Sequence, residues 1–458
     1  MSLTPERAAS TATPALSRRT LATYAIGSLG TGGFATLPGL VLIYFLTDTL
    51  GVAALLAGLL VTVAKVWDVL IDPVIGARSD RSLAATGSRR RFMVLGAVLL
   101  PVFFILTFAV PGGLPPLVSG IWVLLAFMAT ATAFSLFQVP YIALPAELAS
   151  GYHERTRLLS VRVVVLTLAI LLFGAGGPSL RKLGGDNEHL GYLLMAVVAG
   201  LVIGGGMLVS SRVARKATAP VDVAPTSIAD NYRTGLAALK RSAPFRVLLG
   251  TFALQALATG LMLAGAQYVA RWVLGNEGAV DVLFASLIAP ALLFAPVWQL
   301  IARRIGKERG FVIASTLFGV AALALLGMLA APGPWIFVAV GLAGAGYAGM
   351  QSLPMAMLPD VISHDARSHG DGHGGTFGGV WTAGETTGMA LGATVLTIVL
   401  AVTGYRESAG ADIVWQSQAS IAGIVVAFSA VPAVLIALSL VVFRGYALRR
   451  EDIDADAR

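Results

Sequence analysis

The chain has no cysteine and few charged residues. The absence of cysteine from its 458 residues excludes disulfide bonds and thiolate metal ligands. Charged side chains make up 12% of the chain, against ~25% in an average soluble domain. Hydrophobic residues make up 57%, and a soluble protein of this length would need more polar side chains to cover its surface. The composition therefore predicts a membrane protein that crosses the bilayer several times.

Two further kinds of sequence signal are missing. The first 20 residues have no apolar core of the kind found in a cleavable signal peptide, so we expect a short, basic cytoplasmic tail over residues 1–20. The chain also lacks the zinc-binding HExxH pattern, a glycine-rich phosphate loop before a lysine, and the GxSxG elbow of hydrolases. We therefore expect no enzyme activity, no cofactor, and no catalytic or metal site.

Long hydrophobic stretches are what the sequence has in abundance. A helix needs about 20 apolar residues to cross a hydrocarbon core of roughly 30 Å. The hydropathy predicts twelve transmembrane helices, here numbered in chain order, over approximately residues 21–46, 52–77, 92–111, 117–146, 158–176, 190–210, 247–271, 279–302, 310–331, 334–358, 376–403 and 417–443. The predicted fold class is an all-α membrane protein.

The longest polar stretch divides these helices into two sets of six. It predicts a cytoplasmic linker over residues 211–246, between a bundle over 21–210 and a second bundle over 247–443, with a cytoplasmic tail over 444–458. This arrangement is typical of transporters built from two parallel repeats. A Pro-Val pair at the same point near the ends of helices 2 and 8, at residues 73–74 and 296–297, supports an internal repeat.

Basic residues predict the orientation. They concentrate in the tails, in the linker and in alternate loops, whereas the opposite side has only Arg181, Lys182, Arg271 and Arg406. By the positive-inside rule, both termini are cytoplasmic and the chain is a multi-pass protein of the inner (cytoplasmic) membrane. The dispersed arginines lie beside the lipid bilayer, so we expect no nucleic-acid partner. We expect a monomer.

Helix 2 carries the charges that a membrane helix does not need. At 100° per residue, Lys65, Asp68 and Asp72 fall within a sector of about 60°. The equivalent positions of the second repeat are apolar: Ile288, Ala291 and Ala295. Because intramembrane charges are unfavourable unless they pair or face a polar cavity, the stripe predicts a site. One Lys–Asp pair plus a second carboxylate has a net charge of −1, which suits one monovalent cation.

Two other interpretations of this stripe stay open. Lys65 could simply neutralise helix 2 in a structural ion pair, although a single carboxylate would be enough for that. A catalytic carboxylate pair is disfavoured because the chain has no accompanying enzyme motif.

Several motifs resemble the glycoside–pentoside–hexuronide:cation symporters, the melibiose-carrier group. They are YFLTDTLG at 44–51, KVWDVLIDPVIG at 65–76, SRRRF at 88–92, LPMAMLPDVISHD at 353–365, GVWTAGETTGMALG at 379–392 and TGY at 403–405. The resemblance covers nearly the whole chain. It implies the major facilitator fold, in which two six-helix bundles of twelve transmembrane helices give alternating access to a central site.

The resemblance also assigns roles to residues. Asp68 and Asp72 match cation-binding carboxylates, Ser135 on helix 4 matches a hydroxyl that assists the cation, and Lys65 stands where the family often has arginine and balances their charge. Arg162 on helix 5 matches an arginine that engages substrate. A snorkelling role for Arg162 at the interface stays open.

Helices 4 and 11 add candidate solute contacts. Ser135, Gln138 and Tyr141 form one polar edge on helix 4, where Gln138 offers both donors and an acceptor; an inter-helix hydrogen bond is the alternative. On helix 11, Trp381 and Glu385 share a face at i, i+4 and could bind a solute, although Trp381 could instead be packing.

Other polar residues receive different roles. Asp360, at the end of helix 10, and Arg91, in SRRRF, are assigned to gating or structure. The histidine-rich loop 364–375 could bind a metal or respond to pH, but its glycines favour a solvated turn.

Together these features predict a secondary active transporter that couples cation entry to uptake of an organic solute, a sugar, glycoside or related compound. A proton-driven exporter of amphipathic compounds is the alternative, and a receptor or scaffold would have no use for the helix 2 charges. The coupling ion is H⁺ or Na⁺, and we favour H⁺ because burial raises the pKa of a carboxyl group.

The expected solute follows from departures from the family. Sugar-binding members have acidic residues where this chain has Gly32 and Gln138, whereas Arg162 remains. We expect open space at Gly32 and Gly33 and an anionic or glycosylated solute that is bulkier or more apolar than a simple disaccharide.

Overall fold

The computed structural model describes residues 16–148, 152–214, 239–369, 374–408 and 414–448. In these ranges the chain forms helices and no β-strand. Most of the predicted N-terminal tail, linker and C-terminal tail lie outside the described residues, as does the centre of the histidine-rich loop.

The described chain contains twelve helical spans that are long and apolar enough to cross a membrane, as predicted. The first six are formed by α1 (Arg18–Ala25) with α2 (Ser28–Tyr44) and the π-helix η1 (Phe45–Thr49), then α3 (Ala54–Thr86), α4 (Arg90–Phe108), α5 (Pro116–Leu148), α6 (Tyr152–Leu180) with η2 (Arg181–Gly184), and α7 (Glu188–Ser210).

The last six spans follow the same order. They are α9 (Ala243–Tyr268) with the π-helix η3 (Val269–Val273), α10 (Ala279–Ile305), α11 (Lys307–Ala324) with η4 (Leu325–Leu329), α12 (Trp335–His369), α13 (Gly374–Val402), and α14 (Gln418–Phe428) with α15 (Ala430–Phe443).

Most helices extend beyond the apolar stretch that predicted them. Helix α3 continues to Thr86, nine residues past the predicted end at 77, and α12 continues to His369 instead of 358. Hydropathy detects only the part that is apolar, whereas a helix can continue through polar residues because its backbone hydrogen bonds are internal. Helix α3 ends at Gly87, whose φ of +69° is the left-handed conformation that glycine adopts readily.

Small residues bring the helices into close contact. A Cβ atom at Gly96 of α4 would lie 2.5 Å from the carbonyl oxygen of Ala133 on α5, and one at Gly346 of α12 would lie 2.7 Å from that of Ala314 on α11. Such contacts replace the hydrophobic driving force that lipid cannot supply between helices. Large apolar side chains, such as Leu70 and Leu293, instead point outward from the protein with more than half of their surface exposed, as lipid-facing residues do.

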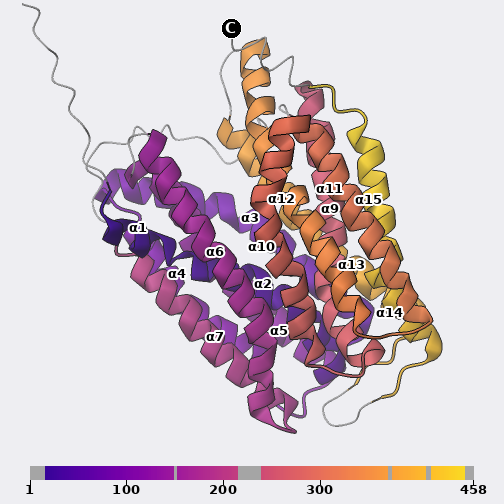
Figure 1. Cartoon of the computed structure of the whole chain (residues 1–458). Helices are drawn as coiled ribbons and strands as arrows, with labels where there is room; N and C mark the ends of the chain where they lie inside the picture. The colour runs from indigo at the N-terminus through magenta and orange to yellow at the C-terminus, as the bar shows by residue number, and fades with distance from the viewer. Residues whose placement is uncertain (1–15, 149–151, 215–238, 370–373, 409–413, 449–458) are drawn as a thin grey trace, which may run out of the picture.

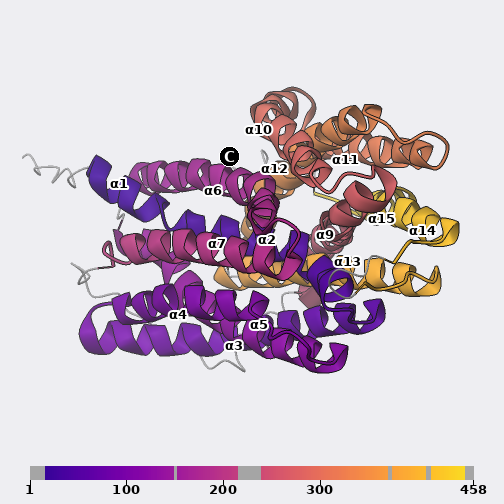
Figure 2. The same cartoon turned by 90° about the horizontal axis from the view of Figure 1, so that it is seen from below.

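The first six spans pack into one bundle and the last six into another, side by side (Figures 1 and 2). The bundles contact each other through α3 with α13, α6 with α10, and α2 with α9. In Figure 1 they diverge towards the end where α1 begins and α15 ends. We call the opposite end, which contains η1, η3 and the start of α3, the distal end.

Candidate cation and solute site

The charged stripe of α3 faces α5 inside the first bundle. The Lys65 Nζ atom lies 3.7 Å from Asp68 Oδ2, and Ser135 Oγ donates a hydrogen bond of 3.2 Å to Asp68 Oδ1. The Lys65 ammonium also lies 5.7 Å from the centre of the Phe34 ring on α2. The side chains of Asp68 and Ser135 are buried, so the carboxylate is held by one charge and one hydroxyl away from lipid.

Asp72 lies one turn further along α3, and its carboxylate has fewer polar contacts than that of Asp68. Its Oδ1 atom is buried and has no hydrogen-bond partner among the described residues. A buried carboxylate oxygen without a partner is unfavourable, so this atom is suited to accept a proton or to coordinate a cation. The structure therefore brings Lys65, Asp68, Asp72 and Ser135 together, as the sequence predicted they could be.

This cluster lies next to a contact between the bundles. Thr62, three residues before Lys65, places its Oγ1 atom 2.5 Å from Oγ1 of Thr394 on α13. At a rise of 1.5 Å per residue, Asp72 on α3 and Glu385 on α13 both lie about 14 Å from this contact, in the direction away from the distal end. The helices are antiparallel, so the two carboxylates stand at similar depth on helices that belong to different bundles.

The polar edge of α5 mostly contacts its own bundle. Gln138 Oε1 accepts a hydrogen bond of 2.7 Å from Thr31 of α2, which leaves its amide nitrogen for another partner. Tyr141 is fully buried, and its hydroxyl donates to the carbonyl oxygen of Tyr24 at 3.0 Å. The Tyr141 side chain is therefore not accessible to a solute in this structure, and its ring packs against the Arg162 guanidinium.

Arg162 on α6 points into the bundle. Its guanidinium carbon lies 5.3 Å from the centre of the Tyr141 ring, and its Nε atom is buried without a hydrogen-bond partner among the described residues. A snorkelling arginine would instead extend its head to the interface. The geometry favours a guanidinium that is ready to pair with an anionic group.

The expected open space at Gly32 is absent, so that prediction is wrong. A Cβ atom at Gly32 would lie 2.8 Å from Cβ of Ala169 on α6, and one at Gly33 would lie 2.7 Å from the Ile203 side chain on α7. Both glycines allow helices to pack closely, and neither enlarges a solute site.

The second bundle contributes Trp381 and Glu385 from α13. The Trp381 ring stacks on Phe252 of α9 with 4.3 Å between centroids and is buried, which matches the packing alternative for its ring. Its Nε1 atom nevertheless lacks a hydrogen-bond partner among the described residues. Glu385 is half-buried one turn further along and keeps part of its surface accessible.

The two residues assigned to gating occupy different surroundings. Asp360 accepts a bond of 2.5 Å from Lys307 Nζ, which ties α12 to α11 within the second bundle. Arg91 is exposed. Its neighbour Arg89 is buried instead, and it contacts Asp80, donates to Glu147 at 2.6 Å and donates to Ser79 at 2.7 Å.

Sequence reasoning therefore missed the arginine that joins α3 to α5. Three consecutive arginines at 89–91 give no signal of which side chain turns inward, because that depends on the rotation of α4 against its neighbours. It also missed a polar network at the distal end around Asp48 and Arg271, where the only signal is the similar spacing of tyrosine and glycine in 44–51 and 268–275.

Comparison with known proteins agrees with this architecture. The sequence profile described as "MFS/sugar transport protein" matches residues 23–450. The chain is 26% identical to the uncharacterized symporter YnaJ of Bacillus subtilis, over 89% of this chain and 87% of that protein. It is 24% identical to the glucuronide carrier protein homolog of Escherichia coli, over 94% and 93% of the two chains.

A solved structure shows the same fold. The crystal structure of the nucleoside transporter NupG superposes with a TM-score of 0.65 and covers 93% of this chain and 98% of that one, at 13% sequence identity.

Proposed function

The chain belongs to the MFS/sugar transport protein family, and we propose that it is a symporter that couples one monovalent cation at Asp68 and Asp72 to uptake of an anionic glycoside. The resemblance to cation symporters of glycosides agrees with relatives named as symporters and as a glucuronide carrier homolog. The single observation that carries the proposal is the buried, unpartnered Asp72 oxygen beside the Lys65–Asp68 pair.

Charge at α3 explains why a cation would be required. Lys65 balances Asp68 at 3.7 Å, so Asp72 remains as one uncompensated carboxylate. Moving this empty site past the barrier would expose a buried negative charge to an apolar environment, which is strongly unfavourable. A bound cation removes that charge and so permits the bundles to move.

We propose that the preferred cation is a proton. The α3 cluster offers the oxygen atoms of Asp68, Asp72 and Ser135, whereas a dehydrated metal cation favours a larger oxygen shell. Protonation of Asp72 needs a single oxygen.

Coupling to the solute follows from position. The α3 cluster lies near the Thr62–Thr394 contact between the bundles, and Glu385 lies on α13 of the second bundle at a similar depth. A solute held between Arg162 of the first bundle and Glu385 of the second would contact both halves. Cation binding that changes the tilt of α3 would then change solute affinity, and the solute would change cation affinity by the same factor.

The solute class follows from the side chains. Arg162 has a buried nitrogen that lacks a partner among the described residues, and a carboxylate would satisfy it with charge-assisted hydrogen bonds. The amide nitrogen of Gln138 can donate hydrogen bonds while its oxygen accepts from Thr31, and Glu385 can accept bonds from hydroxyls. A glycoside with a carboxylate, such as a uronide, matches this set better than a neutral sugar.

For the orientation we propose that both termini face the cytoplasm, which places the distal end outside. The charge distribution of the loops supports this choice, because the basic residues concentrate at the opposite end. The chain is an integral multi-pass membrane protein with a small-molecule solute and a cation as its ligands.

Transport in proteoliposomes tests the proposal. An inward proton gradient without sodium should drive uphill uptake of radiolabelled methyl β-glucuronide, and methyl β-glucoside should compete at least about tenfold less well. Sodium-dependent, pH-independent uptake would overturn the proton as coupling ion. Proton-driven efflux of amphipathic compounds without any uptake of glycosides would establish the exporter alternative.

A further inference from the structure

The two halves end their first spans in the same unusual way. In the first bundle Tyr44 is followed by the π-helix η1, and in the second Tyr268 is followed by the π-helix η3. Each π-helix ends before a glycine in the left-handed region, Gly51 with φ +65° and Gly275 with φ +64°. A single turn of π-helix rotates the following side chains relative to an α-helix and is frequent at functional sites. The repeat of this device points to a shared task at the distal end.

The rotated side chains reach across to the opposite bundle reciprocally. The residue three positions after Tyr44 is Thr47, and its Oγ1 atom lies 2.7 Å from the hydroxyl oxygen of Tyr268. The residue three positions after Tyr268 is Arg271, and its Nη1 atom donates a bond of 2.5 Å to the hydroxyl of Tyr44. The two tyrosine rings meet edge to face with centroids 5.2 Å apart.

Asp48 adds a third link between the bundles. Its Oδ1 atom accepts a bond of 2.6 Å from the hydroxyl of Tyr405, in the loop after α13, and its Oδ2 atom accepts 2.7 Å from Thr47. Thr47 has one hydroxyl proton, so when it donates to Asp48 the proton in its contact with Tyr268 comes from the phenol. Burial raises the pKa of Tyr405 well above its ordinary value, so the phenol remains protonated and able to donate.

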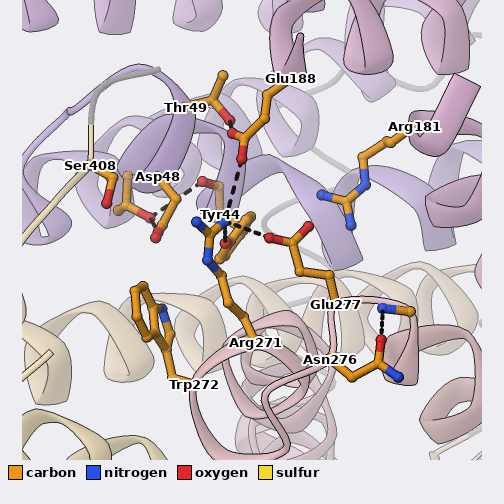
Figure 3. A network of polar contacts seen from close by, with 12 residues as sticks. Tyr44, Asp48, Thr49, Arg181, Glu188, Arg271, Trp272, Asn276, Glu277 and Ser408 are labelled. Carbon is orange, nitrogen blue, oxygen red and sulfur yellow. Dashed lines mark hydrogen bonds and ion pairs between the residues drawn. The ribbon is translucent and has the colours of Figure 1, made fainter. Parts of the chain in front are cut away.

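Charged residues surround this core. Arg271 lies 2.6 Å from Glu277 of its own bundle and 3.4 Å from Glu188 of the first bundle, which also accepts a bond from Thr49 (Figure 3). The backbone nitrogen of Ser408 donates to the carbonyl oxygen of Thr47 at 3.2 Å. The bonds across the bundles are buried or half-buried, so water competes for them weakly.

We propose that Tyr44, Thr47, Asp48, Tyr268, Arg271 and Tyr405 form a distal clasp that holds the bundles together at this end and must open before a solute can enter there. The residues of the clasp are positioning residues: they touch neither the α3 cluster nor Arg162, and they act on transport through the relative position of the bundles. The pseudo-symmetric pair of tyrosine contacts lets both halves release together when they rotate apart. This role is independent of which cation or solute is carried.

Because the chain contains no cysteine, a single introduced cysteine can report opening of the clasp. Ser408 is 1% exposed beside the clasp, so Ser408→Cys should react slowly with a maleimide while the clasp is closed. Protein in nanodiscs exposes both faces to the reagent, which makes the measurement independent of orientation, cation and solute.

The reporter is combined with Thr47→Val, Tyr268→Phe or Asp48→Asn, each of which removes a clasp hydrogen bond with little change in shape. Loss of a buried hydrogen bond to a charged group can shift such an equilibrium by roughly tenfold, so the labelling rate should rise several-fold to tenfold. Tyr192→Phe is the matched control, since its buried hydroxyl also bonds an arginine, Arg181 at 2.7 Å, but within the first bundle.

Unchanged labelling in Thr47→Val and Tyr268→Phe, or an equal rise in Tyr192→Phe, would overturn the clasp. If Asp48→Asn does not fold, the two uncharged variants still decide the question. If the labelling rates change as expected but the unmodified protein does not take up methyl β-glucuronide, the proposed cation and solute site fails and the clasp stands.

Discussion

The hydroxyl oxygens of Thr62 on α3 and Thr394 on α13 lie 2.5 Å apart and form a contact between the two bundles. Thr62 precedes Lys65 by less than one turn of α3, so a movement that separates these threonines would also displace the α3 cluster. This pair connects the cation site to the relative position of the bundles.

A disulfide between Thr62→Cys and Thr394→Cys should therefore arrest transport. The two hydroxyl oxygens are 2.5 Å apart, which is close to the separation of two bonded sulfur atoms, so cysteines at these positions should form a bridge. Oxidation should abolish uptake, and reduction should restore it. The matched control is Thr107→Cys with Thr130→Cys, whose hydroxyls lie 3.2 Å apart between α4 and α5 of one bundle. Full transport in the oxidised Thr62–Thr394 variant would show that this contact does not need to open.

The second prediction concerns the carboxylates of α3. Asp68→Asn and Asp72→Asn should each abolish uphill accumulation, because the site could no longer neutralise its charge with a transported cation. Folding should persist, since amide replaces carboxylate with little change in volume. Accumulation in proteoliposomes and size-exclusion profiles measure the two effects. Asp186→Asn, an exposed carboxylate at the distal end, serves as the control and should keep wild-type uptake. Normal accumulation in both α3 variants would disprove the cation site.

The third prediction concerns Arg162. Arg162→Ala should raise the KM for a uronide at least about tenfold, because a desolvated charge-assisted contact is lost. It should change binding of a neutral glycoside much less. Arg157→Ala removes an exposed arginine from the same helix and should leave both unchanged. An equal loss for charged and neutral glycosides would indicate that Arg162 supports the bundle and does not select the solute.

The fourth prediction concerns packing of α2 on α6. Gly32→Ala should destabilise the protein by about 1–3 kcal/mol, because overpacking forces the helices apart where the new Cβ would lie 2.8 Å from Ala169. Gly176→Ala on α6 is the control, since no heavy atom lies within 4 Å of its added Cβ. Thermal unfolding in detergent should show a lower Tm for the first variant alone. Equal Tm values for Gly32→Ala and Gly176→Ala would mean that α2 and α6 can move apart without loss of stability.

Much of the architecture could be predicted from the sequence because it follows from properties that accumulate along one segment. Apolar runs of about 20 residues identified all twelve spans, since lipid requires that length. Spacing along a single helix likewise placed Lys65, Asp68 and Asp72 on one face, and the structure brings Ser135 to them. The ends of the helices were less predictable, because polar residues continue α3 and α12 without changing the backbone pattern.

Contacts between helices were decided by tertiary structure. The sequence predicted open space at Gly32, but α6 fills it. Arg89 and Arg91 are the same residue type in one run of arginines, and only the rotation of α4 against its neighbours buries Arg89. The clasp depends on a contact between the rings of Tyr44 and Tyr268, which belong to different bundles and lie far apart in the sequence. Hydropathy and helical periodicity are local properties, so they determine which side chains lie on each face of a helix. Which other helix those side chains contact depends on how all the helices pack together, because packing is set by the combined shapes of their surfaces.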